Sequence, residues 1–464
     1  MKISRASIEC QPSRLPEIRF ARDMTLTSYA GLVVFWRLFR DLDLKARLKR
    51  GFEHLDWKSS YKAPELILLM ILHILLGFCR LRGLDYYRHD PLVARIVGLA
   101  RLPSVATLSR QLRVIDHRCV QWLRRFHRKL IISGLRMLSL SHLTLDFDGS
   151  VQYTGGRVEG TAVGFNKRKK GARSYYPLFA TVAQTGQILD LLHRPGNVHD
   201  SKGATAFMTQ TFRRARVALP NAILEARMDS AFFSFERLSA LDRHGVSFTC
   251  SVPFRRLPQL KAHIEAQKDW TPLDNTYELA DIDFKPKTWP QCPLFRFILV
   301  RQRVRTRTKG PIQLDLFEPI DPNFKFTVIV TNDQTSWAGE CIESHHGRGS
   351  QEKLFAQAKQ HAGLGVILTS KLTTNQLFTL ASIAAHNLTQ AIQIFTSTDR
   401  QLPANLPKRP SCWIMAELGT LRQRWLHRAG RLLSPAGRPT LEMSVPDKVR
   451  PEFQTLYKPA KFAA

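Results

Sequence analysis

Cysteine is scarce in this sequence, and no two cysteines stand at the spacing of a CxxC pair. The 464 residues contain 7 cysteines, which lie far apart from one another. An odd number of widely spaced cysteines argues against a disulfide framework and against a zinc finger. These absences fit a protein of the reducing cytoplasm.

Long apolar runs are also absent. The most apolar segment, residues 66–78 (LILLMILHILLGF), is too short to span a bilayer and contains His73. The first residues, MKISRASIECQPSR, lack the apolar core of a signal peptide. We therefore expect no membrane span, and we predict a buried helix at residues 66–78.

Acidic residues are few relative to basic ones. The chain has 38 Asp and Glu against 69 Lys and Arg, a net charge of +31 and a pI of about 10.4. Such an excess costs self-repulsion unless a polyanion relieves it. Basic side chains that contact a nucleic acid also release its condensed counterions. The composition thus predicts a nucleic-acid partner, with a charge that serves only solubility as the alternative.

The first third of the chain has helical patterning. Residues 1–25 are polar and typical of a loose basic arm, and residues 26–138 are expected to form an all-helical DNA-binding domain. Pro64 favours a first helical turn, and Ser104 precedes apolar residues at helical spacing. The second signal resembles a helix-turn-helix, with plain helical packing as the alternative. Three arginines near aromatic residues are candidates for phosphate contact, or for a solvated helix face: Arg124, Arg125 and Arg128.

Residues 139–395 alternate strand and helix signals, which predicts an α/β catalytic domain. LTLDFDG places Leu143, Leu145 and Phe147 on one face of a strand. A hairpin is expected to turn at Thr185-Gly186, and residues 254–324 are expected to be a strand-rich insertion. Residues 396–464 are expected to be a basic C-terminal tail.

Three acids from distant segments stand out. Asp148 ends the strand LTLDFDG, Asp229 follows the short strand AILEAR, and Glu352 lies in GRGSQEKLFAQAK. Asp146 shares a strand face with Asp148 and is a rival for the first position. Unpaired acids on a buried strand are costly, so such a cluster calls for a compensating charge. Each acid alone is more typical of a structural role, and the hypothesis rests on the set.

The segment around Glu352 carries basic residues at helical spacing. His345, Arg348 and Lys359 lie within roughly 40° of the line through Glu352 on an ideal helix of 100° per residue. One helix face would then hold a carboxylate between basic groups, beside a phosphodiester. Gly347 and Gly349 each disfavour helix by about 1 kcal/mol, so the helix is alternatively expected to begin near Ser350, with His345 and Arg348 in a loop.

Phosphodiester chemistry explains why such acids would converge. It requires a nucleophile that reacts at neutral pH and relief of negative charge in the transition state, and two Mg²⁺ ions supply both. Mg²⁺ prefers one or two carboxylates together with water and substrate oxygens. We therefore expect two Mg²⁺ ions, with Mn²⁺ as a substitute, held by Asp148, Asp229 and Glu352, with Asp146 as a possible further ligand.

The sequence resembles the DDE transposases of bacterial insertion sequences. It is similar to the subgroup with a tyrosine-arginine-glutamate-lysine signature, and within it to the IS-thirteen-eighty-type elements. The matching segments, in order, are LDFDGSV, GFNKRKKGARSYYPLFA, TGQILDLLHRPGNVHDSKGA, ARMDSAFF, GRGSQEKLFAQAK and ASIAAHNL. The resemblance implies a ribonuclease-H-like core with a β insertion before the glutamate helix, and a DNA cut-and-join activity.

The resemblance also implies residue roles. Asp148, Asp229 and Glu352 match the three catalytic acids. Arg348 and Lys359 match the basic signature positions that would bind DNA phosphates, and His345 stands where the family has tyrosine. Two further basic residues in the NKRKKGAR stretch are expected to contact DNA: Lys167 and Arg168.

These points together predict a transposase that cleaves DNA at the ends of its element and joins them to a target. The expected partners are double-stranded DNA and a second copy of the chain on that DNA, with no membrane or small-molecule substrate. The expected location is the cytoplasm, at the nucleoid. The alternatives are an inactive relic that binds specific DNA and a ribonuclease-H-like nuclease without a joining step. His199-Asp200 is interpreted as a structural turn rather than a metal pair, since no second histidine stands at ligand spacing.

Overall fold

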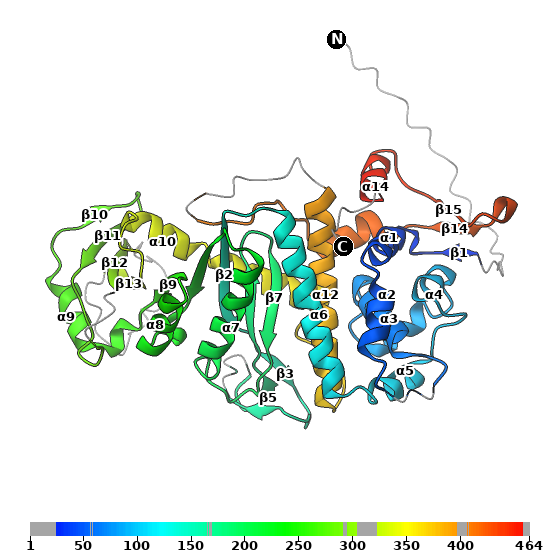
Figure 1. The fold of residues 1–464 in the computed structure, drawn as a ribbon, viewed down its shortest axis with the longest axis horizontal. Helices are drawn as coiled ribbons and strands as arrows, with labels where there is room; N and C mark the ends of the chain where they lie inside the picture. Colours follow the sequence, from blue (N-terminus) through cyan, green and yellow to red (C-terminus); the bar gives the residue numbers. More distant parts are fainter. Residues whose placement is uncertain are drawn as a thin grey trace, which may run out of the picture.

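The central feature of the computed structural model is a mixed sheet. The structure describes residues 25–55, 57, 59–164, 166, 169–290, 295–303, 323–396, 406 and 408–457. Within these residues the sheet has nine strands, in the order β10-β11-β12-β13-β9-β8-β2-β6-β7 (Figure 1). They are β2 (His142–Gly149), β6 (Leu178–Val182), β7 (Gln187–Leu192), β8 (Ile223–Met228), β9 (Ser247–Ser251), β10 (Thr271–Pro272), β11 (Tyr277–Ile282), β12 (Arg296–Arg303) and β13 (Phe324–Thr331).

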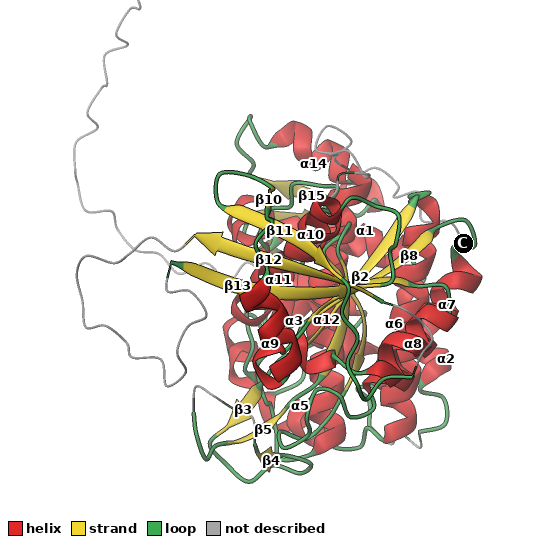
Figure 2. Cartoon of the chain, turned by 90° about the vertical axis from the view of Figure 1, so that its left-hand side faces the viewer, coloured by secondary structure: helices red, strands yellow, loops and turns green. Residues whose placement is uncertain are grey.

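Strand directions divide this sheet. β2, β8 and β9 run parallel to one another, whereas β6 and β7 form an antiparallel hairpin beside β2. That hairpin turns at the predicted site, where Gly186 has a φ of +62°. Figure 2 shows the twist of the sheet, whose strands fan out around β2.

Helices cover both faces of the sheet. The apolar residues Leu143, Leu145 and Phe147 of β2 pack in one core with α7 (Ala204–Ala218) and α8 (Phe235–Arg243), as the alternation predicts. On the opposite face, the ring of Phe179 lies 5.2 Å from that of Phe355 on α11 (Gly349–Ala362). The polar residues of β2 therefore face the side that carries α11.

The first described part of the chain is mainly helical, although Leu26–Thr27 forms a strand, β1. Pro64 lies in the first turn of α3, which is almost wholly buried, and the Ser104 hydroxyl accepts a hydrogen bond from the Thr107 amide at the start of α5. These helices share one core with the long helix α12 (Leu372–Thr396). The helices are α1 (Val33–Asp41), α2 (Leu44–Gly51), α3 (Ala63–Leu75), α4 (Pro91–Val97), α5 (Val105–Leu112) and α6 (His117–Met137), with 3-10 turns η1 (Ala30–Leu32) and η2 (Leu81–Tyr86).

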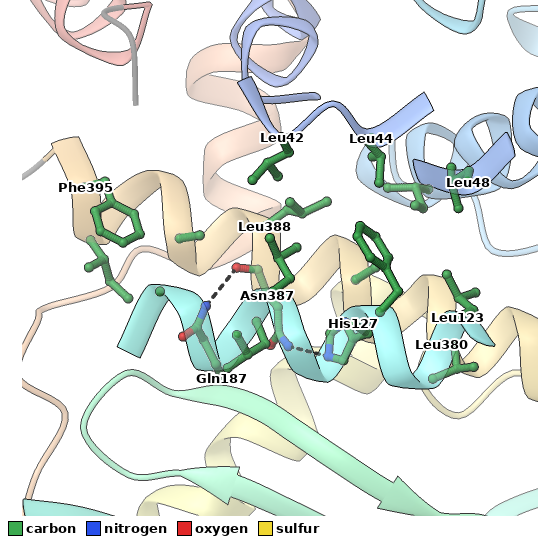
Figure 3. Close-up of a pocket in the computed structure, with 18 of the residues that line it drawn as sticks. Leu42, Leu44, Leu48, Leu123, His127, Gln187, Leu380, Asn387, Leu388 and Phe395 are labelled. Atoms are coloured by element: carbon green, nitrogen blue, oxygen red, sulfur yellow. Dashed lines mark hydrogen bonds between the residues drawn. The ribbon is translucent and has the colours of Figure 1, made fainter. Parts of the chain in front are cut away.

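An apolar cavity lies where this helical part meets α12. Leucines of α2, α6 and α12 line it, and a polar seam formed by His127, Gln187 and Asn387 borders it (Figure 3). In that seam the Asn387 side chain donates to the backbone carbonyl of Ile188 on β7 at 2.7 Å and lies 3.0 Å from the His127 ring. Asn387 thus joins α12 to the sheet.

The insertion extends the sheet beyond β9. Its strands β11 and β12 pair with each other, and β12 pairs with β13, which returns to β9. The expectation of strands is met here, but the segment also contains the helix α9 (Pro258–Ala266) and the 3-10 turn η4 (Phe254–Arg256). Trp270 and Trp289 pack against the core of this region.

The C-terminal segment packs against the helical part. β1 (Leu26–Thr27) pairs with β14 (Gly430–Leu433), which pairs with β15 (Thr440–Met443). Further elements are the 3-10 turns η3 (Ser230–Phe232) and η7 (Pro435–Gly437), the helices α13 (Leu418–Leu421) and α14 (Arg450–Leu456), and the π-helix η6 (Arg422–Leu426). A small sheet consists of β3 (Gln152–Thr154), β4 (Ala162–Val163) and β5 (Arg173–Tyr175). In the described part of the chain, no helix combines the length and apolarity that a bilayer crossing requires.

Candidate active site

Polar residues face one another along one side of the parallel strands β2 and β8. Thr144 stands opposite Glu225, and Asp146 stands opposite Arg227. The Thr144 hydroxyl donates to the Glu225 carboxylate, and Arg227 forms an ion pair with Asp146. Every polar group in these first two rows therefore has a complementary partner.

The third row differs because it holds two acids. Asp148 at the end of β2 and Asp229 just after β8 continue the same register, since Phe147 pairs with Met228. Burial and the nearby charge of Asp229 raise the pKa of Asp148 to about 7. Burial also raises the pKa of Asp229. This end of the strands thus carries negative charge that the fold neutralises incompletely.

Arg348 is the cation at this row. Its guanidinium lies 3.8 Å from the Asp148 carboxylate, and both side chains are partly exposed, at 19% and 23%. The charge of Arg348 lowers the pKa of Asp148 and of Asp229, against the larger effect of burial. A solvent-accessible arginine beside two acids is suited to contact with a phosphate.

Asp200 is a third acid at this place. Its carboxylate accepts hydrogen bonds from the Tyr176 hydroxyl at 2.9 Å and from Arg194 at 3.2 Å. It lies against the backbone that follows Asp148, because a Cβ built on Gly149 would meet an Asp200 oxygen at 2.6 Å. Its charge raises the pKa of both Asp148 and Asp229. The sequence placed this residue in a turn near the site, and the structure shows that its charge acts on the two acids.

The segment that carries Glu352 forms two helices rather than one. α10 (Ala338–His346) ends just before Gly347, and α11 begins at Gly349 with Arg348 at its N-cap, which agrees with the alternative start near Ser350. Glu352 is exposed in the first turn of α11, four residues after Arg348 and therefore on the same side. Among the described residues, no hydrogen bond or ion pair joins the Glu352 carboxylate to Asp148 or Asp229. Lys359 lies two turns further along α11, with its stem close to Gly365.

His345 does not share that face. It lies in the last turn of α10 and is 7% exposed, and its ring nitrogens lie 2.8 Å from the Ser251 hydroxyl and 3.0 Å from the Thr249 hydroxyl of β9. Burial, the largest cause, lowers the pKa of His345 to about 3, so the ring is neutral. This geometry makes His345 an anchor of α10 on β9 and disfavours the DNA contact expected for it.

Asp146 is enclosed by its partner. Both of its oxygens accept from Arg227, at 2.5 and 2.8 Å, and its side chain is 1% exposed. A metal ion would have to displace the guanidinium to reach it. The geometry favours Asp148 over Asp146 as the first acid.

The three arginines of α6 have different surroundings. Arg124 and Arg128 both pair with Asp190 of β7, whose side chain is fully buried, at 2.6 and 2.9 Å. These two arginines join α6 to the sheet, which favours a structural role over phosphate contact. Arg125 is exposed. Lys167 and Arg168 lie outside the described residues.

Potential metal ligands also gather away from the strand ends. Among the described residues, one set of three His, Cys, Asp or Glu donors has all its ligand atoms within 4.8 Å of one another, namely His54, Asp116 and Cys119. There Asp116 caps α6 and accepts from the Cys119 amide, so helix capping accounts for its position. Asp148 and Asp229 supply two carboxylates, and one or two carboxylates suit Mg²⁺, which keeps several water or substrate oxygens.

Comparison with known protein families gives an extensive match. A family model described as Transposase DDE domain group 1 matches residues 17–458. No curated protein matches. Among solved structures, the cryo-EM structure of a piggyBac transposase synaptic complex with hairpin DNA is 11% identical, covers 78% of this chain and 74% of that chain, and gives a TM-score of 0.42. Because the family model spans almost the whole chain, this protein belongs to the DDE transposases of group 1.

Proposed function

We propose that this protein cleaves DNA at the ends of a mobile element and transfers the freed strand to a target, in a reaction that depends on a divalent metal ion. The observation that carries this proposal is the pair of acids in the third row. Asp148 and Asp229 end adjacent parallel strands, and the pKa of each carboxyl is raised by burial. When both carboxyls are ionised, their mutual repulsion favours the binding of a cation between them.

The donor set fits Mg²⁺, with Mn²⁺ as a substitute. Carboxylate oxygens are hard ligands, and one or two of them suffice when water and phosphate oxygens complete the shell. Bound metal ions would activate the attacking oxygen and neutralise charge that develops on the phosphate. Asp148 and Asp229 would hold them, and we propose Glu352 as the third acid because it follows Arg348 by one helical turn.

The chain's own residues supply the rest. Arg348 lies beside Asp148 and would bind a phosphate oxygen of the scissile strand. Lys359 would contact the DNA backbone further along α11, and the exposed Arg125 would do so on α6. Lys167 and Arg168 belong to the same proposal on sequence grounds.

The topology supports the ribonuclease-H-like core that the resemblance implies. The strand order β7-β6-β2-β8-β9 combines an antiparallel hairpin with three parallel strands, and the acids lie at the carboxyl ends of β2 and β8. We also propose the tyrosine-arginine-glutamate-lysine subgroup and a dimer on DNA, since two element ends must be cut together.

A cleavage assay tests the proposal. A supercoiled plasmid that carries the DNA flanking this gene would be incubated with Mg²⁺ or Mn²⁺ and the wild-type protein, or with Asp229→Asn. We expect metal-dependent nicks at the repeat ends with the wild type and none with the variant. Asp447→Asn, at a position whose side chain is 92% exposed, is the matched control and should cleave normally.

The assay also separates the alternatives. Specific DNA binding without cleavage by any protein would favour an inactive DNA-binding relic. Cleavage without joining of a supplied pre-cut 3′ end to the target would favour a nuclease. Cleavage that survives in Glu352→Gln would show that a different group completes the site, and Asp200 would then be the next acid to replace.

A further inference from the structure

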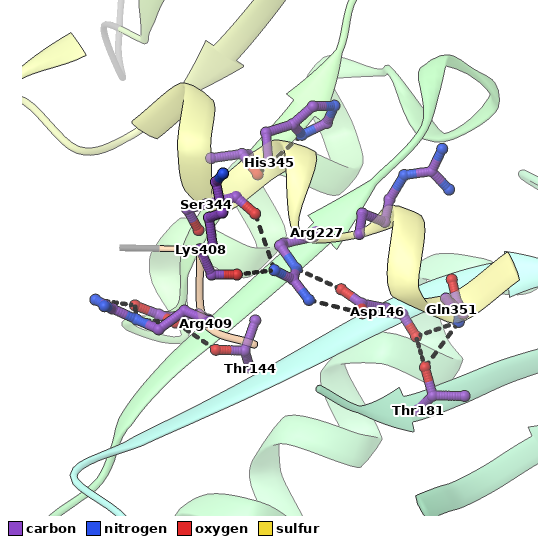
Figure 4. Close-up of polar contacts among 12 residues, drawn as sticks. Thr144, Asp146, Thr181, Arg227, Ser344, His345, Gln351, Lys408 and Arg409 are labelled. Carbon is purple, nitrogen blue, oxygen red and sulfur yellow. Dashed lines mark hydrogen bonds and ion pairs between the residues drawn. The ribbon is translucent and has the colours of Figure 1, made fainter. Parts of the chain in front are cut away.

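The guanidinium of Arg227 joins three segments of the chain. It is 1% exposed, and it donates to both oxygens of Asp146 on β2. Its remaining nitrogen donates to the backbone carbonyls of Ser344 at 2.9 Å and Lys408 at 3.0 Å (Figure 4). Strand β2, the end of α10 and the segment after α12 thus meet on one side chain of β8.

Asp146 extends this connection to α11. Its backbone carbonyl accepts from the Gln351 side chain at 2.9 Å, and the same amide donates to the Thr181 hydroxyl of β6 at 2.9 Å. Gln351 is 1% exposed and lies in the first turn of α11, between Arg348 and Glu352. The helix that carries these two residues is therefore fastened to the strand that ends in Asp148.

The junction between α10 and α11 fits closely around Arg227. A Cβ built on Gly347 would lie 2.2 Å from the Arg227 guanidinium and 2.1 Å from the Lys408 carbonyl. A glycine is required here because the backbone itself occupies the space beside the arginine. The position of the junction is thus determined by Arg227 on one side and Lys408 on the other.

A buried ion pair is a poor source of stability, because its desolvation offsets its attraction. Two apolar side chains of similar volume would fill the same space. They would not, however, hold the carbonyls of Ser344 and Lys408 or set where α10 ends. The role that only the ion pair can perform is the placement of the junction.

We propose that Arg227 and Asp146 are positioning residues, which set Arg348 and Glu352 in place beside Asp148 and Asp229. Each partner stands two residues before one of the acids, so the pair and the acids share two rigid strands. This inference rests on the proposed function, because it assigns a purpose to the placement of Arg348 and Glu352. The pair itself does not touch DNA or metal.

Three variants test the proposal. Arg227→Met with Asp146→Leu replaces the pair by apolar groups and leaves no buried charge. Arg227→Lys keeps the charge beside Asp146 but cannot donate to both oxygens and both carbonyls. Arg438→Lys, at an exposed position, is the control for a conservative change.

Cleavage and DNA binding would be measured separately for each. We expect the first two variants to keep a cooperative thermal transition and wild-type affinity for DNA, and to lose about 10- to 100-fold in the cleavage rate at saturating DNA and metal. A merely structural role would lower the transition temperature without a specific loss of this rate. Cleavage at the wild-type rate by the folded double variant would overturn the proposal.

Hydrogen exchange provides a readout that needs no catalysis. In the double variant the amides of residues 344–352 should exchange faster, while those of β2 and β8 stay as in the wild type. If the wild type itself does not cleave, the proposed function fails, and this measurement alone decides whether the pair places the junction. Unchanged exchange at residues 344–352 would refute the placement.

Discussion

At the scale of single residues, the carboxyl of Asp148 is the most telling group. Its pKa in the folded protein is about 7, above the ordinary value of 3.8. Between pH 3.8 and about pH 7, the Asp148 carboxyl therefore holds a proton in the folded state that it has lost in the unfolded state. Stability contributed by this group is present at low pH and is lost as the pH rises toward 7.

We expect Asp148→Asn to stabilise the metal-free protein above pH 7, because it removes a buried charge near Asp229. The gain should be on the order of 1–3 kcal/mol and should vanish near pH 4. Thermal unfolding at both pH values would measure it. Added Mg²⁺ should stabilise the wild type but not the variant, and equal stabilisation of both would contradict metal binding by Asp148.

Arg348 should control the pH at which the site becomes active. Its charge lowers the pKa of Asp148 and of Asp229, and both must be ionised to hold a cation. In Arg348→Ala the rise of the cleavage rate should therefore move to higher pH, and Arg348→Lys should move it less. Cleavage rates over a pH series would show this, and an unchanged midpoint would mean that Arg348 does not act on these acids.

At the scale of elements, the two glycines that flank Arg348 have opposite roles. A side chain at Gly347 would collide with Arg227 and with the Lys408 backbone, whereas a Cβ at Gly349 meets nothing within 4 Å. We expect Gly347→Ala to destabilise the fold by about 1–3 kcal/mol through overpacking. Gly349→Ala, within the first turn of α11, should be neutral or stabilising by up to about 1 kcal/mol.

Urea unfolding of the two variants would measure this difference. The comparison is sharp because the substitutions are chemically identical and only two residues apart. Equal midpoints would mean that the junction has room to shift, and would weaken the placement assigned to Arg227.

The sequence predicted most elements because their signals were local. The alternation of LTLDFDG, the turn at Thr185-Gly186 and the helix start at Ser104 each depend on neighbouring residues, and each is present in the structure. The helix α9 was missed because its pattern is weak within a segment rich in proline and tryptophan. The single helix face through His345 and Glu352 was wrong, since the chain ends one helix at Gly347 and starts another.

The partners of the candidate site could not be predicted, because they come from distant segments. Arg227 precedes Asp229 by two residues, but nothing in the sequence shows that it faces Asp146. The contacts of Asp200 with Tyr176 and Arg194 likewise depend on the fold. One sequence signal could have indicated the contact between Arg227 and Asp146. Residues two apart on a strand lie on the same face, so a basic residue two positions before a candidate acid is expected on the face that carries the acid.

At the scale of the whole molecule, Arg422 fastens the C-terminal segment to the helical core. The arginine is buried, and it donates to the carbonyls of Ile74 and Leu75 at the end of α3 and to that of His361 on α11. Burial lowers the pKa of this guanidinium to about 10.

We expect Arg422→Met to destabilise the protein by about 2–4 kcal/mol, because it leaves buried carbonyls without donors. Arg438→Met, at an exposed position, should change stability by less than about 0.5 kcal/mol. Chemical denaturation would compare them. A small effect of Arg422→Met would mean that water replaces the lost donors.

The net charge of +31 should appear in the salt dependence of DNA binding. Affinity should fall steeply with salt, since each phosphate contact releases a counterion. Lys359→Ala should reduce the slope of log K against log salt by about one. Binding isotherms over a salt series would measure it, and an unchanged slope would exclude a phosphate contact at Lys359.

The contact between Arg227 and the Lys408 carbonyl has a consequence for synthesis of the chain. A ribosome makes β2, β8 and both acids long before it reaches Lys408, and β1 must wait for β14 at Gly430–Leu433. While Lys408 is still on the ribosome, the growing chain lacks the contact that completes the α10–α11 junction. The junction between α10 and α11 is therefore completed only after the segment that contains Lys408 has been made and has folded back onto β8.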